Sequence, residues 1–173
     1  RGNRGANLMR VQICIPHYFK EKKDPADNPN GYGSLRSGSR MARSMALSRC
    51  ITSLLDCQRN TNTCILNISD QSIDQFSNNE SSVEVAITVC TDGENQIEEV
   101  LSHYKNKIKI VKLATEDPTF LPLACRDFLI GNHDDFDLLT YMEDDIIVSD
   151  KLFFDKQLWF HTKTQHRFSL MPH

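Results

Sequence analysis

Apolar runs alternate with amphipathic segments along the chain, and the first run covers residues 10–16. This run is short, almost wholly apolar and ends in Pro16, a pattern typical of a strand covered on both faces. Further strands are predicted at 63–69, 83–90 and 107–113, with a polar loop at 70–82 between the first two. The 83–90 run has the firmest pattern of the three.

Helical periodicity lies between these strands. Apolar residues recur at three- and four-residue steps from about Ser39 to Leu55. Further helices are predicted after the turn at 91–95, at 120–130 and from Asp150 onward, and a last strand at 166–171. The alternation predicts an α/β fold of three α/β/α layers, in which helices cover both faces of a mostly parallel sheet.

An acidic triplet, Glu143-Asp144-Asp145, stands between two apolar runs in the segment 137–148. Adjacent carboxylates repel one another, and apolar flanks draw them toward a poorly screened position where the repulsion grows. A divalent cation such as Mn²⁺ or Mg²⁺, completed by substrate phosphates, would neutralise them at the end of an interior strand. A solvated acidic turn after a strand is the alternative explanation.

Two segments are predicted to lie outside the packed core. Residues 1–8 are polar and basic and are expected to be a disordered tail or foreign to the native chain, which leaves 9–173 as one domain. Residues 20–39 are rich in Gly, Pro, Asn and Ser and predict a long flexible loop over a ligand.

Charge is distributed unevenly along the 173 residues, whose net charge is -3. Residues 1–50 hold ten Lys and Arg against three Asp and Glu, and residues 51–173 hold ten against twenty. The basic and acidic parts of the chain could simply complement each other. The asymmetry also suits an anionic ligand held between basic side chains and a carboxylate-bound metal. It does not favour nucleic acid, because the basic residues form no dense run and few aromatics are interleaved among them.

The six cysteines form no CxxC pair, and most lie in apolar stretches. Buried free thiols in a reducing compartment are therefore expected rather than disulfides or a zinc site. No stretch is apolar for long enough to predict a membrane span, and the first residues carry no signal-peptide pattern. These features predict a cytoplasmic protein.

Three further residues have two possible roles each. Arg40 and Arg43 occupy the first turn of the predicted helix, where positive charge opposes the helix dipole unless an anion lies nearby. Solvent-facing side chains are the commoner explanation. Asp92 either caps the helix that follows it, the role we favour, or holds the base or ribose of a nucleotide.

The order of these motifs resembles the nucleotide-binding half of the GT-A glycosyltransferases. The resemblance extends over roughly residues 10–160 and rests on motif order and spacing. Its elements are the strand ending in Pro16, the helix ending near Leu55, the Thr91-Asp92-Gly93 strand end, a lysine-rich strand, a helix with Arg126 and the strand into Glu143-Asp144-Asp145.

The resemblance implies roles for the acidic triplet. Asp145 would coordinate Mn²⁺ or Mg²⁺ bridging the diphosphate of a nucleotide-diphosphate sugar, with Glu143 as a second metal ligand. Glu143 and Asp144 would also meet the ribose, the sugar or metal-bound water. Strand alternation would place Glu143 and Asp145 on one face and Asp144 on the other.

The resemblance also implies a binding surface for the nucleotide. Pro16, His17 and Tyr18 match the segment that lines the base, and Asp92 matches the acid that reads it. Arg126 matches a position near the diphosphate or donor sugar.

The implied reaction is transfer of the sugar to an acceptor hydroxyl, with the metal stabilising charge on the leaving nucleoside diphosphate. The acceptor half of the family lies after the acidic motif, where this chain has only 28 residues. The chain is therefore expected to lack part of that half, and no catalytic residue is assigned. His161, His166 and His173 are candidates by residue type, and the acceptor could be a glycan, a lipid or a small molecule.

Two alternatives stay open. A sugar-phosphate nucleotidyltransferase could use the same fold, but its Gly-rich basic loop should directly follow the first strand, whereas Gly33 to Arg40 lies further on. A non-catalytic domain that binds a nucleotide or metal, or that packs against a partner, also fits the short C-terminal part. A P-loop NTPase is disfavoured because no GxxxxGK[ST] motif occurs.

Overall fold

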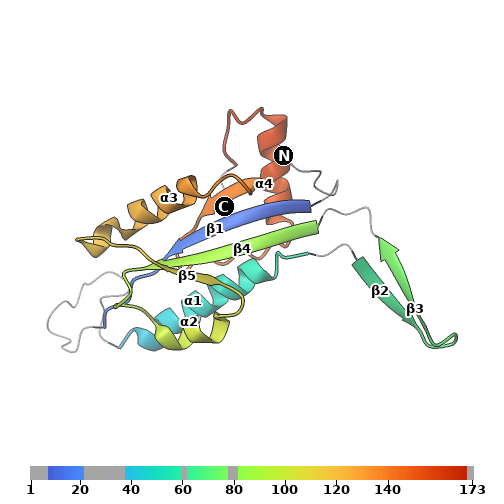
Figure 1. Cartoon of the computed structure of the whole chain (residues 1–173), viewed down its shortest axis with the longest axis horizontal. Coiled ribbons are helices and arrows are strands. Elements are labelled where there is room, and N and C mark those ends of the chain that lie inside the picture. The colour runs from blue at the N-terminus through green and yellow to red at the C-terminus, as the bar shows by residue number, and fades with distance from the viewer. Residues whose placement is uncertain (1–7, 22–37, 60–61, 78–81, 171–173) are drawn as a thin grey trace.

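The computed structural model describes residues 8–21, 38–59, 62–77 and 82–170. Strands and helices alternate along most of this length (Figure 1). The elements are β1 (Leu8–Pro16), α1 (Arg40–Leu55), β2 (Asn62–Asn67), β3 (Ser72–Ser77), β4 (Ser82–Thr91), α2 (Glu98–Tyr104), β5 (Lys109–Lys112), the 3-10 helix η3 (Pro118–Phe120), α3 (Leu121–Gly131), β6 (Leu138–Tyr141) and α4 (Phe153–Lys163).

The central sheet has four parallel strands in the order β5-β4-β1-β6. The two interior strands, β1 and β4, pair along nine residues, from Leu8 opposite Ser82 to Pro16 opposite Cys90. Both are mainly apolar and become fully buried toward their carboxyl ends, as expected for strands covered on both faces. The predicted α/β class with a parallel sheet is confirmed.

Side chains of β1 alternate between two cores. Val11, Ile13 and Ile15 pack in the main core with the apolar residues of α1 and α2 and with Phe154 of α4. Cys14 points to the opposite face, which α3 covers. Figure 1 shows α1 and α2 on one side of the sheet and α3 on the other, so the predicted three layers are present.

Because all four strands run parallel, their carboxyl ends lie at the same end of the sheet. These ends are Pro16, Thr91, Lys112 and Tyr141. The loops that follow β1, β4 and β6 carry His17 and Tyr18, Asp92, and the acidic triplet. Ligands of open α/β sheets bind at this end of the sheet.

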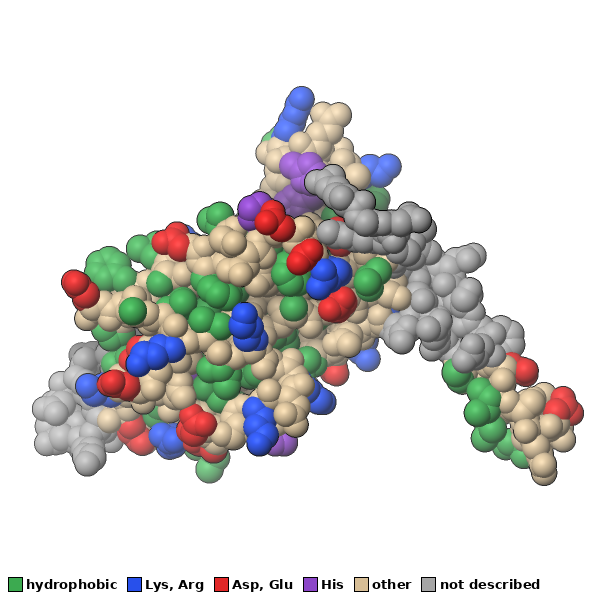
Figure 2. Space-filling model, viewed as in Figure 1, with side chains coloured by type: hydrophobic (Ala, Val, Ile, Leu, Met, Phe, Trp, Pro, Cys, Tyr) green, Lys and Arg blue, Asp and Glu red, His purple; other side chains and the backbone are tan. Residues whose placement is uncertain are grey.

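Two sequence-based predictions of secondary structure were wrong. The segment 70–82 was expected to be a polar loop, but it contains β3, which pairs antiparallel with β2 in a separate two-stranded sheet. Figure 2 shows this hairpin set apart from the main body, with apolar side chains along one flank. The final strand expected at 166–171 is absent over 166–170, the part of it that the structure describes.

Several other expectations concern segments that are only partly described. Most of the predicted loop at 20–39 and of the predicted tail at 1–8 lies outside the described residues, although Leu8 belongs to β1. No helix among the described residues has the length and apolar character needed to cross a membrane. All six cysteines are free; five are buried and Cys64 is exposed.

Candidate functional site

The acidic triplet lies in a turn beyond β6 and not in a strand. β6 ends at Tyr141, and the turn is closed by a bond of 3.3 Å from the Ile146 N–H to the Glu143 carbonyl. The predicted strand leading into the triplet is present as β6, but it lies at the edge of the four-stranded sheet that the structure describes and not in its interior, and the apolar run 146–148 does not continue it as a strand. The second apolar run misled the prediction, because Ile146 and Ile147 remain 46% and 52% exposed.

Asp144 is the buried member of the triplet, with only 7% of its surface exposed. Its Oδ2 accepts a bond of 2.7 Å from Nδ1 of His17, and its Oδ1 pairs with Nη2 of Arg43. Burial alone would raise the pKa of Asp144, but the His17 hydrogen bond and the Arg43 charge outweigh it and hold the pKa below the usual range. Asp144 is therefore an ionised anchor inside the protein.

The hydrogen bonds of His17 fix its tautomer. The Ile97 backbone N–H donates to Nε2 at 3.1 Å, so this nitrogen must carry the lone pair. Nδ1 consequently carries the proton and donates it to Asp144. The imidazole is 1% exposed and joins the exit of β1 to the start of α2 and to the turn after β6.

Arg43 supplies the positive charge that the acidic triplet requires. Besides Asp144, it binds Oδ2 of Asp145 through Nη1 at 3.0 Å. Arg40, one turn earlier in α1, binds both carboxylate oxygens of Glu99 at 3.0 and 2.7 Å. The expectation that these side chains face water holds for Arg40, whose ion pair lies on the surface, but is wrong for Arg43, which points to the acidic turn. The unfavourable position of both in a first helical turn was the sequence signal for nearby anions.

Burial, rather than strand alternation, separates the three acids. The Asp145 side chain is 48% exposed and Glu143 is also exposed, whereas Asp144 points inward. The expected division of the triplet therefore holds, but its cause is the geometry of the turn. Asp145 and Glu143 are the members that can meet a ligand from solvent.

Asp92 caps the turn that follows β4. Its Oδ1 accepts bonds from the N–H groups of Glu94 and Asn95 at 2.9 and 2.8 Å, and Oδ2 accepts from the Asn95 amide at 2.7 Å. Burial would raise the pKa of Asp92, but these bonds lower it overall. The helix α2 begins later, after Ile97, so Asp92 caps the turn and not the helix.

Gly93 makes this turn possible, because its backbone φ of +84° is one that residues other than glycine rarely adopt. We expect Gly93→Ala to lower the free energy of unfolding by about 1 kcal/mol. The matched control is Gly131→Ala, at a glycine with ordinary φ and open space around its Cα. Urea denaturation compares the two, and equal midpoints would contradict the role of Gly93.

The segment after β1 lies along the same turn. The N–H of His17 donates to the Cys90 carbonyl, and the N–H of Phe19 to the Asn95 carbonyl, both at 2.8 Å. Burial and the charge of Asp92 raise the pKa of Tyr18, so this phenol stays protonated and able to donate. The structure thus brings Pro16–Tyr18 together with Asp92, as the sequence-based site required.

The ring of Tyr141 connects Arg126 to the acidic triplet. The Arg126 guanidinium stacks over Tyr141 at 5.0 Å from the ring centroid, and the Tyr141 hydroxyl donates to Glu143. Burial and Glu143 raise the pKa of this phenol. Tyr141, which the sequence did not single out, therefore links Arg126 to the acidic turn.

A groove runs beside β6, and Glu143 and Tyr141 line it together with Phe153, Gln157 and His161 of α4. His161 stacks on His166 with ring centroids 6.0 Å apart. His161 thus shares a groove with one of the acids, whereas His173 lies outside the described residues.

The exposed acids suit Mn²⁺ or Mg²⁺. These hard cations take oxygen ligands, and Mg²⁺ is normally held by one or two carboxylates plus substrate phosphates. Asp145 offers an exposed carboxylate, and Glu143 offers a second. Among the described residues, a cluster of three potential metal ligands occurs only at Cys14, Cys90 and Cys125, so a metal at the turn would depend on ligands from a substrate.

Comparisons with known proteins found one structural similarity. No protein-family model matches the chain, and no curated protein matches it in sequence. The crystal structure of S. aureus TarS residues 1–349 superposes with a TM-score of 0.48 at 12% identity, covering 95% of this chain. The chain spans 39% of that structure's length.

Proposed function

We propose that the carboxyl edge of the sheet binds a nucleotide-diphosphate sugar with Mn²⁺ or Mg²⁺ and that the domain belongs to a glycosyltransferase. The observation that carries the proposal is the pairing of a buried, ionised Asp144 with an exposed Asp145 directly beside it. His17 and Arg43 hold Asp144 in place. The neighbouring carboxylate is thereby presented rigidly to solvent at the edge where α/β sheets bind ligands.

The surrounding residues suit the parts of such a donor. Pro16–Tyr18 and the Asp92 turn adjoin one another and would receive the nucleoside, with the protonated Tyr18 as a donor. Asp145 and Glu143 would hold the metal, which would stabilise negative charge on the leaving diphosphate. Arg126 lies beyond Tyr141, where a guanidinium can bind phosphate oxygens.

Arg43 has a second role in this proposal. Its guanidinium pairs with both Asp144 and Asp145 and offsets one of their two negative charges, which leaves the turn able to attract a metal. A metal bound to a diphosphate would share Asp145 with Arg43, and the guanidinium would also offset the phosphate charge. This competition predicts weak binding of the metal alone and stronger binding of the metal with a nucleoside diphosphate.

Thermal denaturation with a panel of nucleoside diphosphates and nucleotide sugars, with and without Mn²⁺, tests the proposal. We expect stabilisation that requires both the nucleotide and the metal, since ligands that bind only the folded state raise its stability. Asp127→Asn, at an exposed residue of α3, should respond as the unchanged chain does. No response to any nucleotide with Mn²⁺ would contradict the proposal and favour a domain that only contacts partners.

A further inference from the structure

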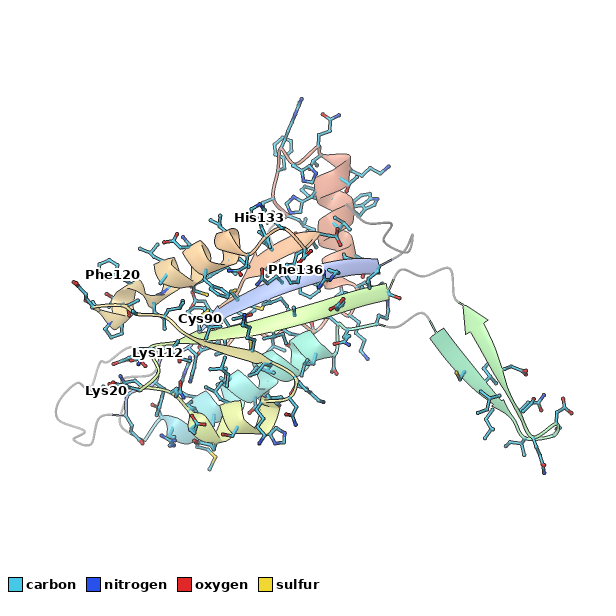
Figure 3. The ribbon with its side chains drawn as sticks, in the orientation of Figure 1. Lys20, Cys90, Lys112, Phe120, His133 and Phe136 are labelled. Atoms are coloured by element: carbon cyan, nitrogen blue, oxygen red, sulfur yellow. The ribbon has the colours of Figure 1, made fainter. Side chains whose placement is uncertain are left out.

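Three buried cysteines meet on the face of the sheet that α3 covers. Cys14 comes from β1, Cys90 from the end of β4 and Cys125 from α3, and each is 0% exposed. Figure 3 shows Cys90 at the end of β4 that lies beneath α3. All three Sγ atoms lie within 4.8 Å of one another. No part of the proposed donor site uses these thiols.

The spacing of the sulfurs fits a single metal ion. A metal–thiolate bond is about 2.3 Å long, so three sulfurs around one ion in a plane lie roughly 4 Å apart. The observed limit of 4.8 Å accommodates this triangle with small side-chain adjustments. The three residues come from three different elements, and the sheet and α3 hold them in place.

The surroundings favour a soft ion with three ligands. Leu129 closes the cluster, with Leu113, Phe128 and Tyr141 packed against it. Among the described residues, no His, Asp, Glu or further Cys joins the group as a fourth ligand. Structural zinc sites are almost always four-coordinate, whereas thiolates without nitrogen or oxygen ligands select soft ions such as Cu(I).

The three thiols lose their protons with unequal ease. Hydrogen bonds from Cys125 and Cys90 and the charge of Lys109 lower the pKa of the Cys14 thiol, whereas hydrogen bonding within the cluster and burial raise the pKa of Cys90 and Cys125. Lys109 lies over the ring of Phe128, 5.7 Å from its centroid, on the same face of the sheet. A positive charge here offsets part of the cost of burying thiolates.

From this geometry we infer that Cys14, Cys90 and Cys125 form a buried three-thiolate site for one Cu(I) ion. Each thiol that coordinates the ion releases its proton to solvent, and no oxidation or reduction is involved. The ion enters through local opening of α3, whose packing on this cluster rests on Cys125 and Leu129. Bound Cu(I) would tie α3 to β1 and β4 near the strand ends that lead to His17 and Asp92.

Anaerobic titration of the reduced protein with Cu(I), in competition with a chromogenic Cu(I) chelator, tests the inference. We expect one Cu(I) per chain to be withheld from the chelator, with the ultraviolet absorption of copper–thiolate bonds. Cys14→Ser, Cys90→Ser and Cys125→Ser should each weaken binding by more than the roughly 10- to 100-fold that loss of an outer-shell partner costs. Cys64→Ser, at the exposed cysteine, and Cys57→Ser, at a buried one outside the cluster, should bind as the unchanged chain does.

Folding of each variant is checked by circular dichroism, and only variants that keep the native spectrum are compared. If all three cluster variants misfold, the test is instead the rise in melting temperature that Cu(I) causes in the unchanged chain and in Cys64→Ser. Equal stabilisation of the two supports the site, and no stabilisation overturns it. Copper bound equally by folded cluster variants, or a preference for Zn²⁺ over Cu(I), would also overturn it. Because nucleotide is absent throughout, these outcomes are independent of the proposed transferase.

Discussion

Asp144→Asn is expected to destabilise the protein by about 3 kcal/mol, because it removes one charge of a largely buried ion pair. The Arg43 side chain is only 18% exposed and would lose its main counter-charge. His17 would keep an acceptor for Nδ1–H, since an amide oxygen can replace the carboxylate oxygen. The loss therefore reports on the charge of Asp144 rather than on its shape.

The dependence of this loss on pH gives a second test. The pKa of Asp144 is lowered in the folded protein, so its contribution to stability is fully present above its unfolded pKa and is lost as pH falls through the folded value. A protonated Asp144 is neutral, like asparagine. The difference in unfolding free energy between the unchanged chain and Asp144→Asn should thus shrink below about pH 4.

Urea denaturation at several pH values measures both quantities, with Asp127→Asn as the control. The control changes an exposed carboxyl of α3 and should shift stability by no more than about 0.5 kcal/mol. A difference for Asp144→Asn that stayed constant between neutral and acidic pH would show that Asp144 is not the ionised anchor described here.

Asp145→Asn is expected to have the opposite profile, with little effect on folding and a large effect on ligand binding. The side chain is 48% exposed, and exposed ion pairs contribute only about 0–1 kcal/mol, so the loss of its contact with Arg43 should cost little. As the proposed metal ligand, however, it should lower metal-dependent nucleotide affinity by at least the roughly 100-fold that loss of an outer-shell partner can cost.

Calorimetric titration of a nucleoside diphosphate in the presence of Mn²⁺ compares Asp145→Asn with the unchanged chain. Glu143→Gln is the informative neighbour, because its carboxylate is exposed and engaged by Tyr141 rather than by Arg43. We expect a smaller loss for it than for Asp145→Asn. Unaltered affinity in Asp145→Asn would remove this residue from the proposed site.

The order of elements was predictable because its signals are local. Apolar runs such as 83–90 and helical periodicity up to Leu55 depend on a few neighbouring residues, and the structure has β4 and α1 there. The strand β3 was missed because its polar sequence carries no apolar alternation; it forms by pairing with β2 across a turn. Such pairing is not encoded in the segment itself.

The site could be predicted only in part, for a similar reason. Residues at strand ends, such as His17 and Asp92, follow from the position of each strand and the parallel sheet. The partner of the acidic triplet does not, because Arg43 lies 102 residues from Asp145 in sequence and reaches it only through packing of α1 on the sheet. The sequence indicated that the triplet needs a cation and that Arg43 suits an anion, but only the structure pairs the two.

The three-thiol cluster has the same origin. Cys14, Cys90 and Cys125 share no spacing motif and were expected to be separate buried thiols. Alternation along β1 and β4 determines which face each cysteine meets, but only the packing of α3 brings the third sulfur to the other two. The sequence thus predicted their burial and missed their proximity.

Paramagnetic broadening by Mn²⁺ in the amide NMR spectrum, recorded with a nucleoside diphosphate, tests the central claim most directly. The donor site described here predicts broadening that is centred on Asp145, extends to Glu143 and the His17–Tyr18 segment, and requires the nucleotide. Broadening centred instead on the remote exposed acids Asp134 and Asp135, or the same pattern without nucleotide, would contradict it.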